Sequence, residues 1–373
     1  MLKQIAFAVF LAAASLGAAD ARSFTEDLAA CKDGPDPKAR AEACAAAIEA
    51  GELQGDALAA AFAQYGMALF DSGEHQRGLA AATEAMRLNP DAGRYAFLRG
   101  VMHHQLADCP NAQADFDRAL SLGEARPEAF IYRAECYRKE DALRALGDFD
   151  MAIRLAPESA DAHFGRAAAL AELGRKNDAR ASAETGLSLA PEKPESYVRR
   201  AFVHASFKDT TLAKADLAQA LTLDADFIPA LAALAELTYT DGQLDAALGY
   251  YDRILRISPD NPGILNNRCY LAAEMNRLDE ALQNCDASIA SEATEINLDS
   301  RGFVYLKRGD AEKALTDFDA ALKLDPKAPA SLYGRGVALA RLGRLDEGKA
   351  NTGAAAILDP EIAAFYDKNG LKP

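Results

Sequence analysis

Apolar and small residues recur along this chain at helical spacing, in pairs of segments joined by short turns. The clearest pair lies between Ile296 and Pro326, with Gly309-Asp310 as the turn and Pro326 at the end of the second segment. The positions that define the pattern are Leu298, Arg301, Gly302, Tyr305, Ala314, Phe318 and Ala321. This spacing predicts two amphipathic helices whose apolar faces meet.

The same pattern occurs nine times in tandem between residues 59 and 362. The predicted repeats are 59–92, 93–126, 127–159, 160–193, 194–227, 228–261, 262–294, 295–328 and 329–362. Small residues at the eighth and twentieth positions let two helices approach closely, and a larger residue at the twenty-fourth fills the gap above them. A repeat array of this length buries a continuous core although no repeat could do so alone.

The pattern resembles the tetratricopeptide repeat (TPR), which has a large residue, then Leu-Gly, Tyr, Ala, Phe and Pro over 34 residues. The resemblance covers most of the chain. It implies an all-α fold, an α-solenoid of tandem helix-turn-helix hairpins that winds into a right-handed superhelix. First helices would line its concave side and second helices its convex side.

The segments that flank the repeats are expected to have separate roles. Residues 1–21 contain Lys3, a short apolar run and an Ala19-Asp20-Ala21 cleavage site, as a signal peptide does. Residues 22–58 predict a short helical cap, and residues 363–373 a C-terminal capping tail. No later segment is apolar for long enough to span a membrane. We therefore expect the exported bacterial type of the family, soluble in the periplasm or secreted.

Six cysteines agree with export, because disulfides persist in oxidising compartments. In the register of the repeat, two cysteines face each other within one hairpin, two join the helices of the cap, and two lie in neighbouring repeats. The expected pairs are Cys31 with Cys44, Cys269 with Cys285, and Cys109 with Cys136. The alternative is six free, buried thiols.

The sequence predicts neither an enzyme nor a cofactor or metal site. It lacks the nucleophile-elbow, Walker, zincin and Cys-x-x-Cys motifs. His103 and His104 are adjacent on a helix and point about 100° apart, so they are poorly placed to share a metal. Asp-Phe-Asp recurs around the aromatic core residue of several repeats, which favours a structural role or a solvated face. The formal net charge of −15 disfavours nucleic-acid binding.

Arginine occupies the seventh position of seven repeats. The arginines are Arg99, Arg133, Arg166, Arg200, Arg268, Arg301 and Arg335. Four of these repeats carry aspartate at the twenty-third position, namely Asp115, Asp148, Asp216 and Asp317, and the other three carry Ser182, Asn284 and Asn351. We infer an Arg–Asp pair inside each of the four repeats, because guanidinium and carboxylate form a strong forked contact. The alternative is an arginine row that binds an acidic ligand.

The resemblance also implies a ligand groove along the first helices, at the second, fifth, sixth, ninth, twelfth and thirteenth positions. The candidate groove residues are Phe97, Val101, Ile131, Tyr132, Phe164, Arg199, Phe202, Tyr239, Asn266, Asn267, Tyr270 and Tyr333. Apolar and aromatic residues on an exposed face indicate binding. The alternative is that a tightly wound superhelix buries them.

The leading hypothesis is a non-catalytic scaffold that binds an unidentified protein or peptide in this groove, in the cell envelope. A binding module for an envelope polysaccharide, or for its synthesis or export machinery, is the alternative. Family members that bind chaperone carboxylates use a Lys, Asn and Arg clamp over three consecutive repeats. No three repeats here supply that set, so such a ligand is not expected.

Overall fold

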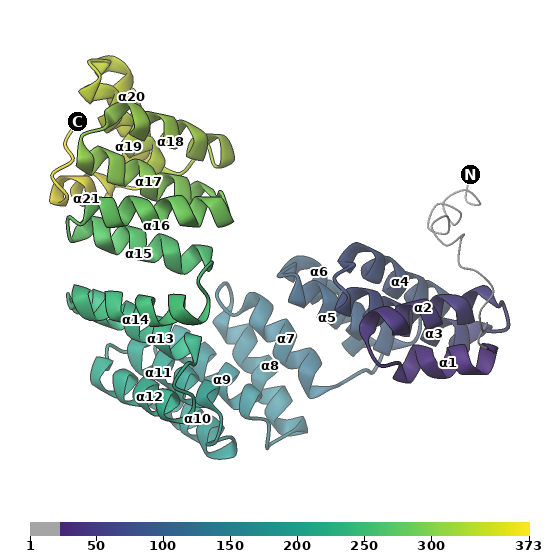
Figure 1. Ribbon diagram of the computed structural model, residues 1–373. Coiled ribbons are helices and arrows are strands. Elements are labelled where there is room, and N and C mark those ends of the chain that lie inside the picture. The colour runs from purple at the N-terminus through teal and green to yellow at the C-terminus, as the bar shows by residue number, and fades with distance from the viewer. Residues whose placement is uncertain (1–22) are drawn as a thin grey trace. The chain divides into compact units, whose positions relative to one another are not determined.

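In the computed structural model, which describes residues 23–373, the regular secondary structure of the described residues consists of 21 α-helices (Figure 1). Consecutive helices pack against one another as hairpins joined by short turns. The predicted all-α solenoid of hairpins is confirmed. The predicted signal peptide lies outside the described residues.

The chain forms two compact units that divide after Gly186. The helices that begin in the first unit are α1 (Phe24–Asp33), α2 (Pro37–Glu49), α3 (Gly55–Asp71), α4 (His75–Leu88), α5 (Gly93–Gln105), α6 (Cys109–Ser121), α7 (Pro127–Tyr137), α8 (Ala142–Leu155), α9 (Ala160–Glu172) and α10 (Lys176–Leu189). The helices of the second unit are α11 (Pro194–Ser206), α12 (Thr210–Leu223), α13 (Ile228–Thr240), α14 (Leu244–Ile257), α15 (Pro262–Glu274), α16 (Leu278–Ser291), α17 (Glu295–Arg308), α18 (Ala311–Leu324), α19 (Pro329–Arg341), α20 (Leu345–Leu358) and α21 (Ile362–Lys368).

Local sequence signals explain where these helices begin and end. Ser23 caps α1, and Glu26 returns a bond to the Ser23 backbone, so the two residues form a capping box. Thr294 caps α17, which ends at Gly309 with φ 92°, a left-handed conformation that favours glycine. Helix α3 starts at Gly55, earlier than the predicted start of the first repeat at residue 59, because no proline interrupts the stretch from Asp56 to Phe70.

Small residues bring the two helices of a hairpin into backbone contact. In the first full hairpin a Cβ atom on Gly66 would lie 2.9 Å from the Gly78 carbonyl oxygen. In the last full hairpin a Cβ atom on Gly336 would lie 2.8 Å from the Gly348 carbonyl oxygen. These are the eighth and twentieth positions of the repeat, so the sequence pattern and the closest backbone approach coincide.

The C-terminal helix α21 covers the last hairpin. Tyr366 on α21 is fully buried, and its hydroxyl donates to the Ala330 carbonyl oxygen over 3.0 Å. Its ring lies 4.8 Å from that of Tyr333 and 6.0 Å from that of Phe303. The tail therefore closes apolar surface that would otherwise face solvent at the end of the array.

The four Arg–Asp pairs inside single repeats are confirmed. They are Arg99–Asp115, Arg133–Asp148, Arg200–Asp216 and Arg301–Asp317, each formed by two N–H donors with N···O distances of 2.5–2.9 Å. All four carboxylates are less than a tenth exposed. Asn351 accepts from Arg335 over 3.0 Å, whereas Ser182 and Asn284 donate to backbone carbonyls instead.

Arginine also joins each of several hairpins to the preceding one, which the sequence analysis missed. The pairs are Arg133–Asp117, Arg166–Asp150, Arg268–Asp252, Arg301–Asp286 and Arg335–Asp319, with N···O distances of 2.5–2.8 Å. The second aspartate of each Asp-Phe-Asp motif thus binds the seventh-position arginine of the following repeat. The first aspartate binds the seventh-position arginine of the same repeat, so the motif has a structural role.

The structure joins Cys31 to Cys44 and Cys269 to Cys285, two of the three expected pairs. The expected bond between Cys109 and Cys136 is absent, and both residues are thiols. Their neighbourhood follows the expectation, since the Cys109 thiol hydrogen bonds with that of Cys136. Burial raises the pKa of the Cys136 thiol, which disfavours the thiolate that disulfide exchange requires.

The two carboxylates of Arg301 should differ in their effect on stability. Asp317 is 4% exposed, whereas the Asp286 side chain is 57% exposed. We expect Asp317→Asn to lower the free energy of unfolding by about 2–3 kcal/mol, because it breaks a buried pair. Asp286→Asn should cost less than about 1 kcal/mol. Urea unfolding followed by circular dichroism measures both, and equal losses would contradict this assignment.

The cysteine assignment predicts a thiol count. The native chain, unfolded without reductant, should show two reactive thiols, those of Cys109 and Cys136. A thiol-reactive chromophore measures this number, and the Cys109→Ser, Cys136→Ser double variant should show none. A count of zero in the wild type would mean that the third bond forms, and a count of six that none does.

Candidate functional site

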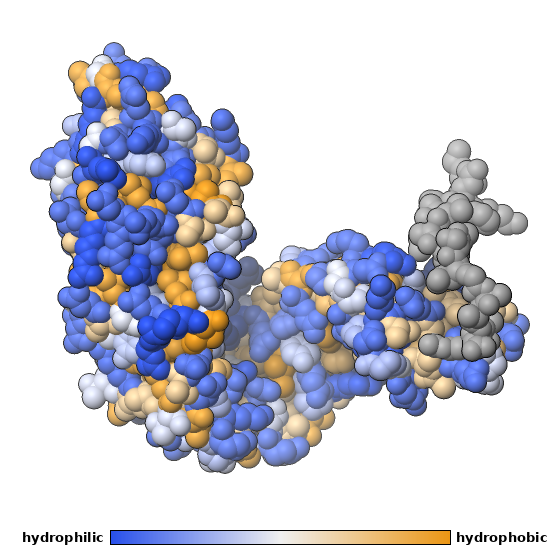
Figure 2. Space-filling view, in the orientation of Figure 1, coloured by the Kyte–Doolittle hydropathy of each residue, from blue (hydrophilic) through white to orange (hydrophobic). Residues whose placement is uncertain are grey.

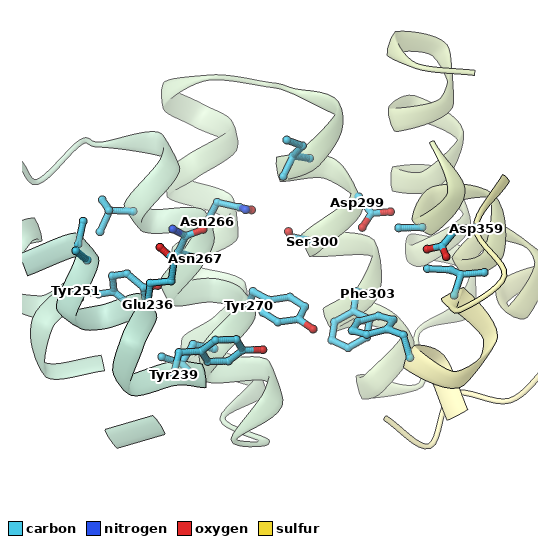
Figure 3. Close-up of a pocket in the computed structure, with 18 of the residues that line it drawn as sticks. Glu236, Tyr239, Tyr251, Asn266, Asn267, Tyr270, Asp299, Ser300, Phe303 and Asp359 are labelled. Carbon is cyan, nitrogen blue, oxygen red and sulfur yellow. The ribbon is translucent and has the colours of Figure 1, made fainter. Parts of the chain in front are cut away.

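The second unit contains a groove of about 840 Å³, a size typical of ligand-binding pockets (Figure 3). Its lining comes mainly from α13, α15 and α17, which are the first helices of successive hairpins. Single residues of α11, α14 and α19, together with α21 and the turn before it, complete the lining. The arrangement follows the expected placement of a ligand groove along the first helices.

Stacked aromatic rings form part of the groove wall. The Tyr270 ring lies 5.6 Å from that of Phe303 and 6.3 Å from that of Phe365, in stacked orientations. Figure 3 shows Tyr270 on one side of Phe303 with Tyr239 close by. Phe303 is fixed by its contact with Tyr366 beneath it. These three rings pack against one another.

Two large apolar side chains of the groove face solvent. Phe202 on α11 is 57% exposed, and Ile296 on α17 is 60% exposed. Figure 2 shows apolar residues reaching the surface of the C-terminal hairpins among mostly hydrophilic ones. Exposed apolar residues that border a concave surface are typical of binding sites.

The groove contains carboxylates, asparagine amides and tyrosine and serine hydroxyls. The Asn266 side chain is 7% exposed, and its Oδ1 atom has no hydrogen-bond partner. Tyr239 and Tyr270 hydrogen bond with each other and with Glu274. Burial, followed by the bond to Glu274, raises the pKa of Tyr239 to about 12. Both tyrosines therefore stay neutral at physiological pH, and Asn266 keeps a free acceptor.

Asp299 on α17 is a groove carboxyl with a shifted pKa. Burial, with a smaller contribution from the neighbouring Glu295, raises its pKa to about 7. The Ser331 hydroxyl donates to Asp299 Oδ1 over 2.6 Å and opposes this shift. Near neutral pH the carboxyl therefore exchanges a proton readily, and its charged form lacks a cationic partner among the described residues.

The groove brings together five of the twelve predicted ligand residues. They are Phe202, Tyr239, Asn266, Asn267 and Tyr270. Arg199 is exposed on α11 but is absent from the lining. Phe97, Val101 and Tyr132 are half-buried in the first unit, where the Tyr132 ring contacts His104 and Phe116.

Three predicted ligand residues are core residues instead. Ile131, Phe164 and Tyr333 are each less than a tenth exposed. Phe164 fills the space above Gly186, where a Cβ atom would lie 3.0 Å from its ring. Tyr333 packs against Tyr366 of the tail. Their prediction as surface residues was wrong, because the repeat position does not reveal which neighbouring glycine or tail residue covers them.

The acidic residues of the groove were not among the predicted ligand residues. Glu236 is the ninth residue of its predicted repeat and Asp299 the fifth, both groove positions in the resemblance. Phe365 and Ile362 also line the groove, and they come from the tail, whose path the repeat pattern does not predict.

Other candidate chemistry finds no further support. Among the residues the structure describes, no group of three or more His, Cys, Asp and Glu could hold a metal ion. His103 and His104 face different carboxylates, those of Asp108 and Glu135. Within residues 23–373, none of the helices has the length and apolar character needed to cross a bilayer.

Comparison with family models gives matches along most of the chain. A model described as tetratricopeptide repeat matches residues 66–129, 137–194 and 204–262. A second, described as TPR repeat, matches residues 302–343. The matched segments cover parts of both units.

Individual relatives share the repeat rather than the whole protein. The human mitochondrial import receptor subunit TOM70 is 24% identical over 246 residues, which is 61% of this chain and 40% of the receptor. The TPR repeat-containing thioredoxin TTL4 of Arabidopsis thaliana is 34% identical over 77 residues, 20% of this chain and 11% of that protein. The crystal structure of yeast Tom70 is similar in fold, with a TM-score of 0.52 at 14% identity over 93% of this chain and 96% of that one.

The raised pKa of Asp299 predicts a pH-dependent stability. The folded state holds the proton more tightly than the unfolded state, whose aspartate has a pKa near 3.9. The stability from this proton is complete below pH 4 and is lost as pH rises through about 7. Asp299→Asn removes this loss. We therefore expect the free energy of unfolding of the variant to exceed that of the wild type by about 1–4 kcal/mol at pH 8 and to equal it at pH 4.

Chemical unfolding across this pH range checks the expectation. Asp346→Asn, a change of an exposed carboxylate on α20, is the matched control. A stability difference between Asp299→Asn and wild type that stayed constant from pH 4 to pH 8 would contradict the assignment of the titration to Asp299.

Proposed function

Because the chain belongs to the tetratricopeptide repeat family, we propose that it is a non-catalytic scaffold that binds a segment of a partner protein in the groove of its second unit. One observation supports this above all. Exposed Phe202 and Ile296 border a concave surface that also holds the unpaired acceptor of Asn266. Apolar side chains beside an unpaired amide oxygen suit a polypeptide ligand, because a polypeptide supplies both apolar side chains and backbone N–H donors.

The preformed shape of the groove favours binding. Tyr270, Phe303 and Phe365 hold one another in place, and Tyr366 fixes Phe303 from below. Aromatic side chains that are already ordered by packing lose little conformational entropy when a ligand binds. The partner would supply side chains that cover Phe202 and Ile296, which face water in the free protein.

We place this function in the cell envelope. Two disulfides suit an oxidising compartment, and the first 21 residues carry the features of a signal peptide. The human relative is named as an import receptor subunit, which agrees with a binding role and does not bear on the compartment. The partner of this chain would therefore be an envelope or exported protein.

A pair of matched double variants tests the groove. Phe202→Ala with Ile296→Ala removes two groove side chains that are 57% and 60% exposed. Leu324→Ala with Leu345→Ala removes two that are 58% exposed outside the groove lining. Because these side chains are largely exposed, neither double variant should change the free energy of unfolding by more than about 1 kcal/mol, as thermal unfolding would show.

The readout is recovery of partners from envelope extract on the immobilised protein, quantified by mass spectrometry. At least one partner should fall about tenfold or more with the groove variant and stay unchanged with the control, since anchor truncation costs on the order of 1–2 kcal/mol. Equal recovery of every partner by the wild type and the groove variant would overturn the proposed site.

A further inference from the structure

The groove has a one-sided charge. Its lining includes the four carboxylates of Glu236, Asp299, Asp359 and Glu361 and no arginine or lysine. None of the four forms an ion pair within the described part of the chain. By contrast, aspartates elsewhere in the second unit pair with arginine repeatedly, as Asp252, Asp286 and Asp319 do. The four carboxylates thus carry charge that no cation of the described residues balances, although Asp299 accepts from the Ser331 hydroxyl and Asp359 from the Glu361 backbone N–H.

One neutral polar group of the groove, the side-chain oxygen of Asn266, lacks a hydrogen-bond donor. Asn266 Oδ1 is buried without a hydrogen-bond partner, and a buried acceptor of this kind is destabilising until a donor reaches it. Two of the three groove tyrosines, Tyr239 and Tyr270, already interact with each other and with Glu274. A ligand that brought N–H donors would satisfy Asn266, and one that brought acceptors or anions would not.

The aromatic wall accepts a cation within this chain. The Lys307 amino group lies 5.8 Å from the centre of the Phe303 ring, next to the groove and outside its lining. Burial lowers the pKa of Lys307, and nearby Glu274 opposes that shift. The Phe303 ring therefore already has a cation of this chain near its face, in surroundings where burial disfavours the charged form.

Together these features specify the partner further than the proposed function does, and the inference rests on that function. We propose that the groove selects a polypeptide segment that combines apolar side chains with lysine or arginine, and discriminates against acidic segments. The apolar side chains would cover Phe202 and Ile296, and the cationic ones would meet Glu236 and Asp299. A chaperone-type carboxylate ligand would be repelled here.

Three synthetic peptides of about 12 residues test the preference. All carry Leu and Phe at the same positions, and the remaining positions hold Lys with Ser, Gln with Ser, or Glu with Ser. Fluorescence anisotropy with the full chain at about pH 8 gives their dissociation constants. We expect the Lys peptide to bind about tenfold or more tightly than the Gln peptide and the Glu peptide to bind most weakly, with the differences shrinking between about 0.1 M and 0.5 M salt.

Charge variants assign the preference to the groove. Glu236→Gln with Asp299→Asn should bring the Lys peptide to within about threefold of the Gln peptide and leave the Gln peptide unchanged. Glu312→Gln with Asp346→Asn, which changes two exposed carboxylates outside the lining, should keep the preference. This control matters because the net charge of −15 attracts cations everywhere.

The outcomes separate this inference from the proposed function. Equal binding of the Lys and Gln peptides, or loss of the preference in the control variant, overturns the cationic inference alone. Binding of all three peptides that is insensitive to Phe202→Ala with Ile296→Ala overturns the groove itself. Failure of every peptide to bind at about 100 μM protein counts against both.

Discussion

A guanidinium group that hydrogen bonds with two carboxylates is the constraint on which the rest of this structure depends. Arg301 contacts Asp317 of its own hairpin through two N–H groups and Asp286 of the preceding hairpin through a third. Only arginine offers enough donors in one rigid plane for this arrangement. The buried carboxylate fixes the direction of the guanidinium, and the second carboxylate then ties the hairpin to its neighbour.

The groove follows from this linkage. Its lining comes from first helices that belong to different hairpins, so its shape depends on how each hairpin meets the next. Arg268 and Arg301 make such links among the hairpins that line it. Many aspartates of the second unit form ion pairs with arginine, as Asp252 does with Arg268. Glu236 and Asp299 line the groove without such an ion pair, and we therefore assign them to ligand binding.

The sequence predicted the repeat well and the surface poorly, for physical reasons. Helical period, small-residue positions and the Arg301–Asp317 pair are all local to one repeat, and the structure has them. The Arg335–Asp319 contact joins two repeats, and its signal was present in the recurring Asp-Phe-Asp motif but was not connected to the next arginine. Exposure is harder still: Phe202 is open and Phe164 buried, although both occupy first helices, because Gly186 makes room for the second ring.

Side-chain amide resonances report most directly on whether the first helices form a binding surface. Asn266 lies in the groove with a free acceptor, and Asn284 on α16 is similarly buried but donates to the Glu280 carbonyl. Nuclear magnetic resonance of both amides, before and after addition of the lysine-containing peptide, compares them within one sample. The account predicts that the Asn266 signals shift and the Asn284 signals do not. A bound peptide that leaves Asn266 unchanged, or shifts Asn284 instead, would contradict it.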